Sequence, residues 1–309
     1  MNKFISFPRM GSYTEIIAKL FEELGADVVL ASSFNERAFK IAIATSPEMQ
    51  CLPFKWTLAD YIDILEKTDN KIILLQYKTC AGRCRFHCYY FTQTEILKKL
   101  KYRFSGIYPI RSGFLSVVDV MDITGANIGE VLFAFKRLYK RIKELEEQLY
   151  PKTGDIKIGL IGELWTLNDE RANLNLVKKL QNLGCYVENS LALSHFINDG
   201  FKMFLSRKRR LLRKRAKKIF PEILGGHLIN NIESTIQFAE KKFDGIILVK
   251  PLTCMPETFG ETIINSLAEE YKMPLFMQNC DEMGSETNLE NRLEAFIESI
   301  RIKKNDSGH

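Results

Sequence analysis

The sequence contains the same strand–helix–strand pattern twice, and this repeat limits the fold more than any other feature. In the first copy, an apolar strand at residues 3–7 precedes a helix over 15–24, whose apolar residues recur at helical spacing, and a strand at 26–30. In the second copy, a strand at 156–162 precedes a helix over 173–183 and a further strand. This pattern is typical of a parallel sheet covered by helices.

The two copies continue in the same order. Residues 73–80 and 247–254 each form an apolar, strand-like stretch that ends in Thr-Cys. A helix is expected after each stretch, and then another strand. We therefore predict an α/β protein of two related domains with mostly parallel sheets. Because ligands bind beyond the carboxyl ends of the strands in open parallel sheets, a cleft between two such domains would receive cysteines from both sides.

A long charged helix, expected over residues 133–150, separates the two copies, and Pro151 and a Thr-Gly-Asp turn follow it. We place the domain boundary at this turn, because a chain of 309 residues has room for two domains of ordinary size. The prediction is an N-terminal domain at 1–150 and a C-terminal domain at 151–309. The first carries Cys51, Cys80, Cys84 and Cys88, and the second carries Cys254.

No apolar run approaches the roughly 20 residues that cross a bilayer, and the first residues lack the apolar stretch and cleavage site of a signal peptide. We therefore expect a cytoplasmic protein without a membrane span. That compartment keeps thiols reduced, so the seven cysteines are not expected to form a disulfide framework. Metal binding or catalysis is the favoured role of these cysteines, and their spacing distinguishes between the two.

Three of the cysteines form a C-x3-C-x3-C run, namely Cys80, Cys84 and Cys88. Helical spacing would put the three thiols on one face, whereas a loop around Gly82 would fold them around a cluster. The run is not a zinc-type C-x2-C pair, and no second pair completes a zinc site. Arg83 and Arg85 would stabilise thiolates or an anionic cluster, so the run favours an iron–sulfur cluster over a hard cation.

Other residues with suitable chemistry carry weaker signals. His87 lies beside the cysteine run and is a candidate proton donor. Asp281 and Glu282 follow the second sheet, where helix capping competes with acid–base chemistry as their role. Cys185 and Cys280 are expected to be small buried side chains. No P-loop and no G-x-G-x-x-G follows the first strand, which excludes P-loop ATP hydrolysis and the usual mode of NAD binding.

Four segments, in this order, resemble the 2-hydroxyacyl-CoA dehydratase and benzoyl-CoA reductase superfamily, and within it the activase-related branch of CoA protein activases. They are Cys51-Leu52-Pro53-Phe54-Lys55, the run from Thr79-Cys80 through Cys84-Arg85-Phe86 to Tyr89, Cys254-Met255-Pro256, and Asp281-Glu282 with Asn291-Arg292-Leu293-Glu294-Ala295-Phe296. The resemblance spans most of the chain.

The resemblance implies two Rossmann-like domains with a [4Fe-4S] cluster in the cleft between them. The implied ligands are Cys51, Cys84 and Cys254, with Cys80 as a fourth candidate. In relatives the second motif reads more like C-G-P-C-R-F-G, whereas here its first two cysteines are one residue further apart and Cys88 is an extra thiol. This difference leaves open which cysteines bind, and whether the cluster is larger than one cubane or double.

The resemblance also implies a function. The protein would be a component of the 2-hydroxyacyl-CoA dehydratase type that accepts low-potential electrons from an ATP-hydrolysing activator of the actin/Hsp70 type. The electrons would serve reductive or radical chemistry on an acyl-CoA substrate, in an oxygen-sensitive, anaerobic system, with a second dehydratase-like subunit or as a homodimer. Two alternatives remain open: a non-catalytic electron-transfer or assembly partner of such a system, and a zinc-stabilised binding module.

The net charge of +6 comes from one segment. Between residues 202 and 218 lie ten Lys or Arg and no acid, so the rest of the chain carries −4. Apolar residues recur among the charges at roughly helical spacing, which predicts a basic amphipathic helix at 202–218 in the C-terminal domain. It would pack on that domain, or dock an acidic partner, the phosphates of CoA or an anionic membrane surface. Nucleic-acid binding is disfavoured, because no stacking surface or recognised module accompanies the helix.

Overall fold

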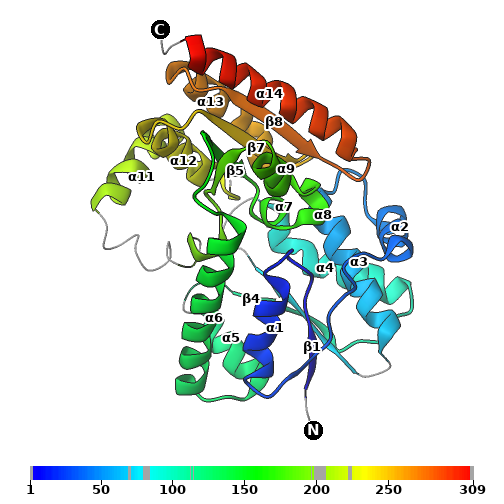
Figure 1. The fold of residues 1–309 in the computed structure, drawn as a ribbon. Helices are drawn as coiled ribbons and strands as arrows, with labels where there is room; N and C mark the ends of the chain where they lie inside the picture. Colours follow the sequence, from blue (N-terminus) through cyan, green and yellow to red (C-terminus); the bar gives the residue numbers. More distant parts are fainter. Residues whose placement is uncertain are drawn as a thin grey trace. The chain divides into compact units, whose positions relative to one another are not determined.

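The computed structural model describes residues 3–68, 71–78, 84–111, 113, 115–195, 197, 207–221 and 225–306. The chain divides into two compact units, Met1–Glu144 and Leu145–His309. Each unit contains one four-stranded parallel sheet with helices around it (Figure 1). Within the described ranges, no helix is both long enough and apolar enough to cross a membrane.

The strands of the first unit run parallel in the order β2-β1-β3-β4. They span Phe4–Ser6 (β1), Asp27–Val28 (β2), Ile73–Tyr77 (β3) and Gly106–Ile110 (β4). The helices are α1 (Thr14–Glu22), α2 (Glu36–Thr45), α3 (Leu52–Lys67), the 3-10 helix η1 (Arg85–Cys88), α4 (Tyr89–Lys99), α5 (Leu115–Thr124) and α6 (Ile128–Leu149), whose last residues belong to the second unit.

The strands of the second unit run parallel in the order β6-β5-β7-β8. They span Ile156–Gly162 (β5), Cys185–Asn189 (β6), Gly245–Pro251 (β7) and Leu275–Cys280 (β8). The helices are α7 (Leu164–Asn168), α8 (Glu170–Asn173), α9 (Leu176–Asn182), α11 (Arg207–Ile219), α12 (Leu228–Glu240), α13 (Met255–Glu270) and α14 (Glu286–Asp306).

The two sheets have the same strand order when the strands are numbered within each unit. β7 therefore takes in the second unit the position that β3 takes in the first. α3 precedes β3 and α4 follows it. In the second unit, α12 precedes β7 and α13 follows it. The prediction of an α/β fold with two similar, Rossmann-like, parallel-sheet domains is confirmed.

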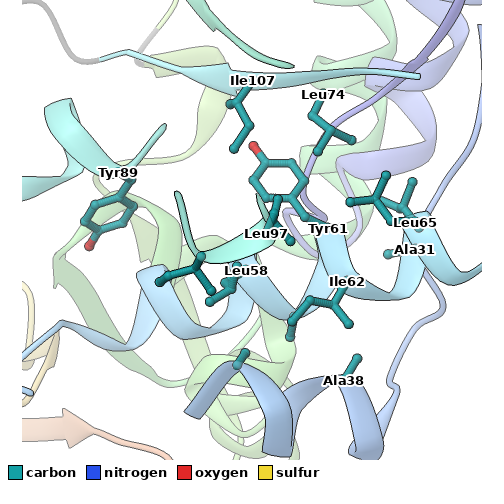
Figure 2. Close-up of a cluster of buried hydrophobic side chains, with 14 of the residues drawn as sticks. Ala31, Ala38, Leu58, Tyr61, Ile62, Leu65, Leu74, Tyr89, Leu97 and Ile107 are labelled. Carbon is teal, nitrogen blue, oxygen red and sulfur yellow. The ribbon is translucent and has the colours of Figure 1, made fainter. Parts of the chain in front are cut away.

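The core of the first unit forms between the sheet and helices α3 and α4 (Figure 2). Leu74 of β3, Leu97 of α4 and Tyr61 of α3 meet there, and the Tyr61 hydroxyl donates a hydrogen bond to the Leu75 carbonyl at 3.0 Å. α3 is buried on nearly all sides, so even its Asp60 lies inside. The Asp60 carboxylate accepts a hydrogen bond from the backbone N–H of Arg9 at 2.8 Å, which offsets the cost of burying that charge.

Two of the expected helices begin at other residues than predicted. The helix expected over 173–183 is present as α9 but begins three residues later, at Leu176, because Leu174 and Asn175 adopt left-handed backbone conformations with φ of 57° and separate α9 from α8. The side-chain amide of Asn173 donates hydrogen bonds to the carbonyls of Thr166 and Leu167, which belong to α7 and not to α9. The helix expected after residues 247–254 begins without an intervening loop, at Met255, where a proline in the first turn favours a helix start.

Candidate functional site

Cys51 stands at the start of α3, in extended conformation just before the first helical residue. Its side chain is buried, and its Sγ shares a hydrogen bond with the hydroxyl of Tyr89, the first residue of α4. Both helices run antiparallel to the strands that they connect, so they begin at the carboxyl ends of the strands. Cys51 therefore lies where the sequence predicts a ligand site, and it links the starts of two helices.

Cys84 and Cys88 flank the short helix η1. Cys84 is extended and precedes η1, whereas Cys88 is exposed and ends it. The arrangement of both thiols on one α-helical face is not formed, because the α-helix begins only at Tyr89. Cys80 lies outside the described residues, and His87 is partly exposed within η1.

Two contacts hold the Cys84–Cys88 segment next to Cys51. The guanidinium of Arg85 donates a hydrogen bond to the carbonyl of Met49, two residues before Cys51. From the same segment, the ring of Phe86 lies 4.8 Å from the ring of Tyr89, the residue that bonds to the Cys51 thiol. The first unit thus brings a buried thiol and the segment that carries two more thiols to the same end of its sheet.

Cys254 occupies a similar local position in the second unit. It follows β7, its backbone N–H donates to the Pro251 carbonyl at 3.0 Å, and it precedes α13 in extended conformation. Like Cys51, it is buried and is followed two residues later by proline in the first turn of a helix. A thiolate at a helix N-terminus is favoured by the helix dipole.

A buried polar cluster next to Cys254 was not predicted from the sequence. Glu257, in the first turn of α13, is 1% exposed and accepts hydrogen bonds from the backbone N–H of His227 at 3.2 Å and the amide of Asn231 at 2.5 Å. Asn231 also bonds both the N–H and the carbonyl of Gly162, at 2.9 Å each. The starts of α12 and α13 and the end of β5 are thereby tied together.

Burial perturbs the titration of this cluster. It raises the pKa of Glu257 to about 8, an effect that the hydrogen bonds from His227 and Asn231 oppose and the nearby Glu163 carboxylate reinforces. Burial also lowers the pKa of His227 to about 4. Lys250 opposes the shift as well, but burial outweighs it, so the Glu257 carboxyl is mostly protonated at pH 7.

Lys250 belongs to the same region. Its position is unusual in the sequence itself, because it is a charged residue within an apolar strand. It lies in β7 and is 2% exposed, and its ammonium group donates to Glu261 at 2.8 Å and Thr258 at 3.2 Å. A lysine in an apolar strand can be read from the sequence, but its partners on α13 become visible only in the fold.

Comparison with known families supplies the decisive observation. A family model described as CoA enzyme activase uncharacterised domain (DUF2229) matches residues 8–190, more than half of the chain. The chain belongs to this family. The predicted resemblance to the activase-related branch of the 2-hydroxyacyl-CoA dehydratase superfamily is thus confirmed. The matched region of the activase-related family includes Cys51 and the Cys80–Cys88 run, whereas Cys254 and its polar cluster lie beyond it. No curated protein matches the chain.

Thiols are the type of ligand that soft metal ions prefer, and this family member has several of them near helix starts. Cys51 and Cys84 both stand at helix starts, and the neighbouring Arg85 adds positive charge. Among the described residues, which do not include Cys80, no group of three or more His, Cys, Asp or Glu side chains is arranged to hold a metal ion. The predicted ligand set of Cys51, Cys84, Cys254 and Cys80 stays a prediction.

Cys185 and Cys280 are placed differently. Both are buried, and burial raises the pKa of the Cys185 thiol to about 11 and that of the Cys280 thiol to about 12. These thiols stay protonated at neutral pH, so their role is packing.

The basic helix begins at Arg207 in the described part of the chain and runs to Ile219. Leu212 and Ala216 are buried against α12. Arg213 pairs with Glu233 of α12 at 3.1 Å, and Arg215 donates to the Tyr271 hydroxyl at 3.1 Å. Part of the positive charge therefore attaches the helix to its own unit. Among the side chains that the structure describes, Arg210, Lys214, Lys217 and Lys218 are further exposed cations of this helix.

Proposed function

We propose that this protein is a cytoplasmic iron–sulfur protein of the 2-hydroxyacyl-CoA dehydratase type, which accepts low-potential electrons from an ATP-hydrolysing activator of the actin/Hsp70 type. Its substrate would be a CoA thioester. Membership of the CoA enzyme activase-related family supports the link to such a system. A second dehydratase-like subunit, or a second copy of this chain, would complete the assembly.

One observation carries the proposal: the segment that ends in Cys51 lies next to the segment from Cys84 to Tyr89. The hydrogen bond from Cys51 to Tyr89 and the bond from Arg85 to Met49 bring the two segments together. Packing alone gives no reason to bring thiols and an arginine to the carboxyl end of a parallel sheet, where ligands bind.

We assign the cluster ligands to Cys51, Cys84 and Cys254, with Cys80 as the fourth candidate and Cys88 as an additional one. A bound [4Fe-4S] cluster, single or as part of a larger one, would supply one strongly reducing electron at a time. The Tyr89 hydroxyl would donate a hydrogen bond to the Cys51 thiolate, a contact of the kind that tunes cluster potentials. His87, between Cys84 and Cys88, is the candidate proton donor.

Purification without air, followed by iron and sulfide analysis and electron paramagnetic resonance of the reduced protein, tests the proposal. We expect about four iron and four sulfide ions per chain for a single cubane. Cys51→Ala, Cys84→Ala and Cys254→Ala should lower the iron content. Cys185→Ala is the matched control, since this buried thiol should leave it unchanged.

The other outcomes separate the alternatives. Zinc without sulfide would refute the cluster and support a zinc-stabilised binding module. An intact cluster that takes up no electron from an activator and ATP would instead assign a passive role in electron transfer or assembly.

A further inference from the structure

An open hollow of about 560 Å³ lies in the first unit, at the amino ends of β3 and β4. Its lining comes from the second half of α4, the loop that joins α4 to β4 (both labelled in Figure 1), and the chain just before β3. A hollow of this size has room for a small organic ligand. Cys51 and the Cys84–Cys88 segment lie at the other end of the same sheet, so the hollow is separate from the candidate site described above.

Three cationic side chains line the hollow, namely Lys71, Lys98 and Arg103. Lys98 pairs with Glu95 at 2.9 Å, but both side chains are mostly exposed, so this ion pair contributes little. Within the described ranges, Lys71 and Arg103 have no acidic partner. The described lining also contains no Asp or Glu side chain. The hollow is therefore strongly positive and favours an anionic ligand.

The fold alone does not account for these cations. A helix C-terminus favours positive charge, which explains Lys98 near the end of α4, but Lys71 and Arg103 lie outside the helices. The second unit has the same strand order, and its helix α13 corresponds to α4. This helix ends in two acidic residues, Glu269 and Glu270. The same architecture is thus compatible with the opposite charge at this position.

The hollow also presents aromatic rings. Tyr102 and Phe104 line it, and both pack against the core of the first unit. The Tyr102 hydroxyl donates a hydrogen bond to Glu66 at 2.7 Å, so the ring is the part of this side chain that is left for a ligand. Gly106, at the start of β4, adds no side chain and has open space beside it. Aromatic rings stack on nucleobases, whereas lysine and arginine bind phosphates.

We propose that this hollow binds a free nucleoside polyphosphate. The base lies against the rings of Tyr102 and Phe104, and the phosphates are held by Lys71, Lys98 and Arg103. An inorganic anion would engage the cations but leave the rings and most of the volume unused, so a ligand with both parts matches the lining better. The assignment does not depend on the proposed function, because it involves none of the thiols.

Titration calorimetry on the full chain, at low salt and without divalent cations, tests the proposal with ADP, pyrophosphate and adenosine. ADP should bind at millimolar concentration or below. Pyrophosphate lacks the base and adenosine lacks the phosphates, so each should bind at least about tenfold more weakly than ADP. Lys71→Ala and Arg103→Ala should each weaken ADP binding by about tenfold, since each removes a charged hydrogen bond to phosphate.

Lys99→Ala is the matched control. Lys99 is an exposed cation of α4 that neighbours Lys98 in the sequence but does not line the hollow. Its replacement removes the same charge and therefore measures the general electrostatic effect, which should stay within about twofold. Lys71 and Arg103 are exposed as well, so none of the three variants should change the melting temperature.

Three outcomes would overturn the proposal. If Lys71→Ala, Arg103→Ala and Lys99→Ala weaken ADP binding equally, net charge and not the hollow attracts the nucleotide. If pyrophosphate binds as tightly as ADP, the cations hold an anion without recognising a base. If ADP does not bind at millimolar concentration, the hollow is not a nucleotide site. The iron and sulfide content of the protein, which tests the proposed function, is independent of all three results.

Discussion

Replacing Glu257 with glutamine should change how the stability of the protein depends on pH. The carboxyl is buried at the start of α13, and its pKa is raised from 4.5 to about 8. The folded state therefore keeps the proton over a range in which the unfolded state has lost it. Since the folded pKa lies above the unfolded one, this group's contribution to stability is fully present below the unfolded pKa and is lost as the pH rises towards the folded pKa.

The size of the effect follows from the proton difference. Each pH unit between the two pKa values costs about 1.4 kcal/mol of unfolding free energy. Between about pH 5 and about pH 7, native protein should lose roughly 2–3 kcal/mol because of Glu257 alone. A glutamine of nearly the same shape has no proton to lose. His227, whose pKa is lowered to about 4, gives the opposite trend, but it is present in both proteins and cancels in their difference.

Urea unfolding of native and Glu257→Gln protein at both pH values measures this difference. The variant should gain roughly 2–3 kcal/mol relative to native protein on going from the lower to the higher pH. An equal difference in unfolding free energy at the two pH values would show that Glu257 is ionised in the folded protein, and the reasoning would be wrong.

Two further substitutions test the structure, both by denaturant unfolding. Gly162→Ala should destabilise by about 3 kcal/mol, since φ is 144° and the new Cβ would lie 1.8 Å from the Val249 carbonyl oxygen. Gly25→Ala, at φ of 80° with open space around it, should cost only about 1 kcal/mol, and equal costs would contradict the predicted clash. Arg213→Ala should cost about 1 kcal/mol by breaking its ion pair with α12, whereas the exposed Lys214→Ala should cost less than about 0.5 kcal/mol. A reversed order would mean that the ion pair does not attach α11.

The parallel sheets could be predicted because their strands are short apolar runs that end in turns. Helix α3 could not, for a physical reason. It is buried on nearly all sides, so its sequence lacks the one-sided apolar pattern of a surface helix, and Asp60 and Asp63 suggest exposure. Their carboxylates are instead paired with backbone N–H groups of residues far away along the chain, Arg9 and Ser32. Such pairings become visible only once the chain has folded.

Some residues of the candidate site could likewise be predicted from the sequence, and others could not. Cysteines can be recognised by residue type and spacing, and Cys51, Cys84 and Cys254 all stand at helix starts. The cluster around Glu257 has no local pattern, because Asn231 and Glu257 meet only through the packing of α12 on α13.

The arrangement of the two hydrophobic cores has a consequence for synthesis on the ribosome. The buried residues of the core around α3 all come from the stretch between Ala31 and Ile107, and those of the core around α12 from the stretch between Ile161 and Met273. Neither set interrupts the other along the chain. The first core can therefore close while the second half is still being translated, so that Cys51 is buried before Cys254 has been made.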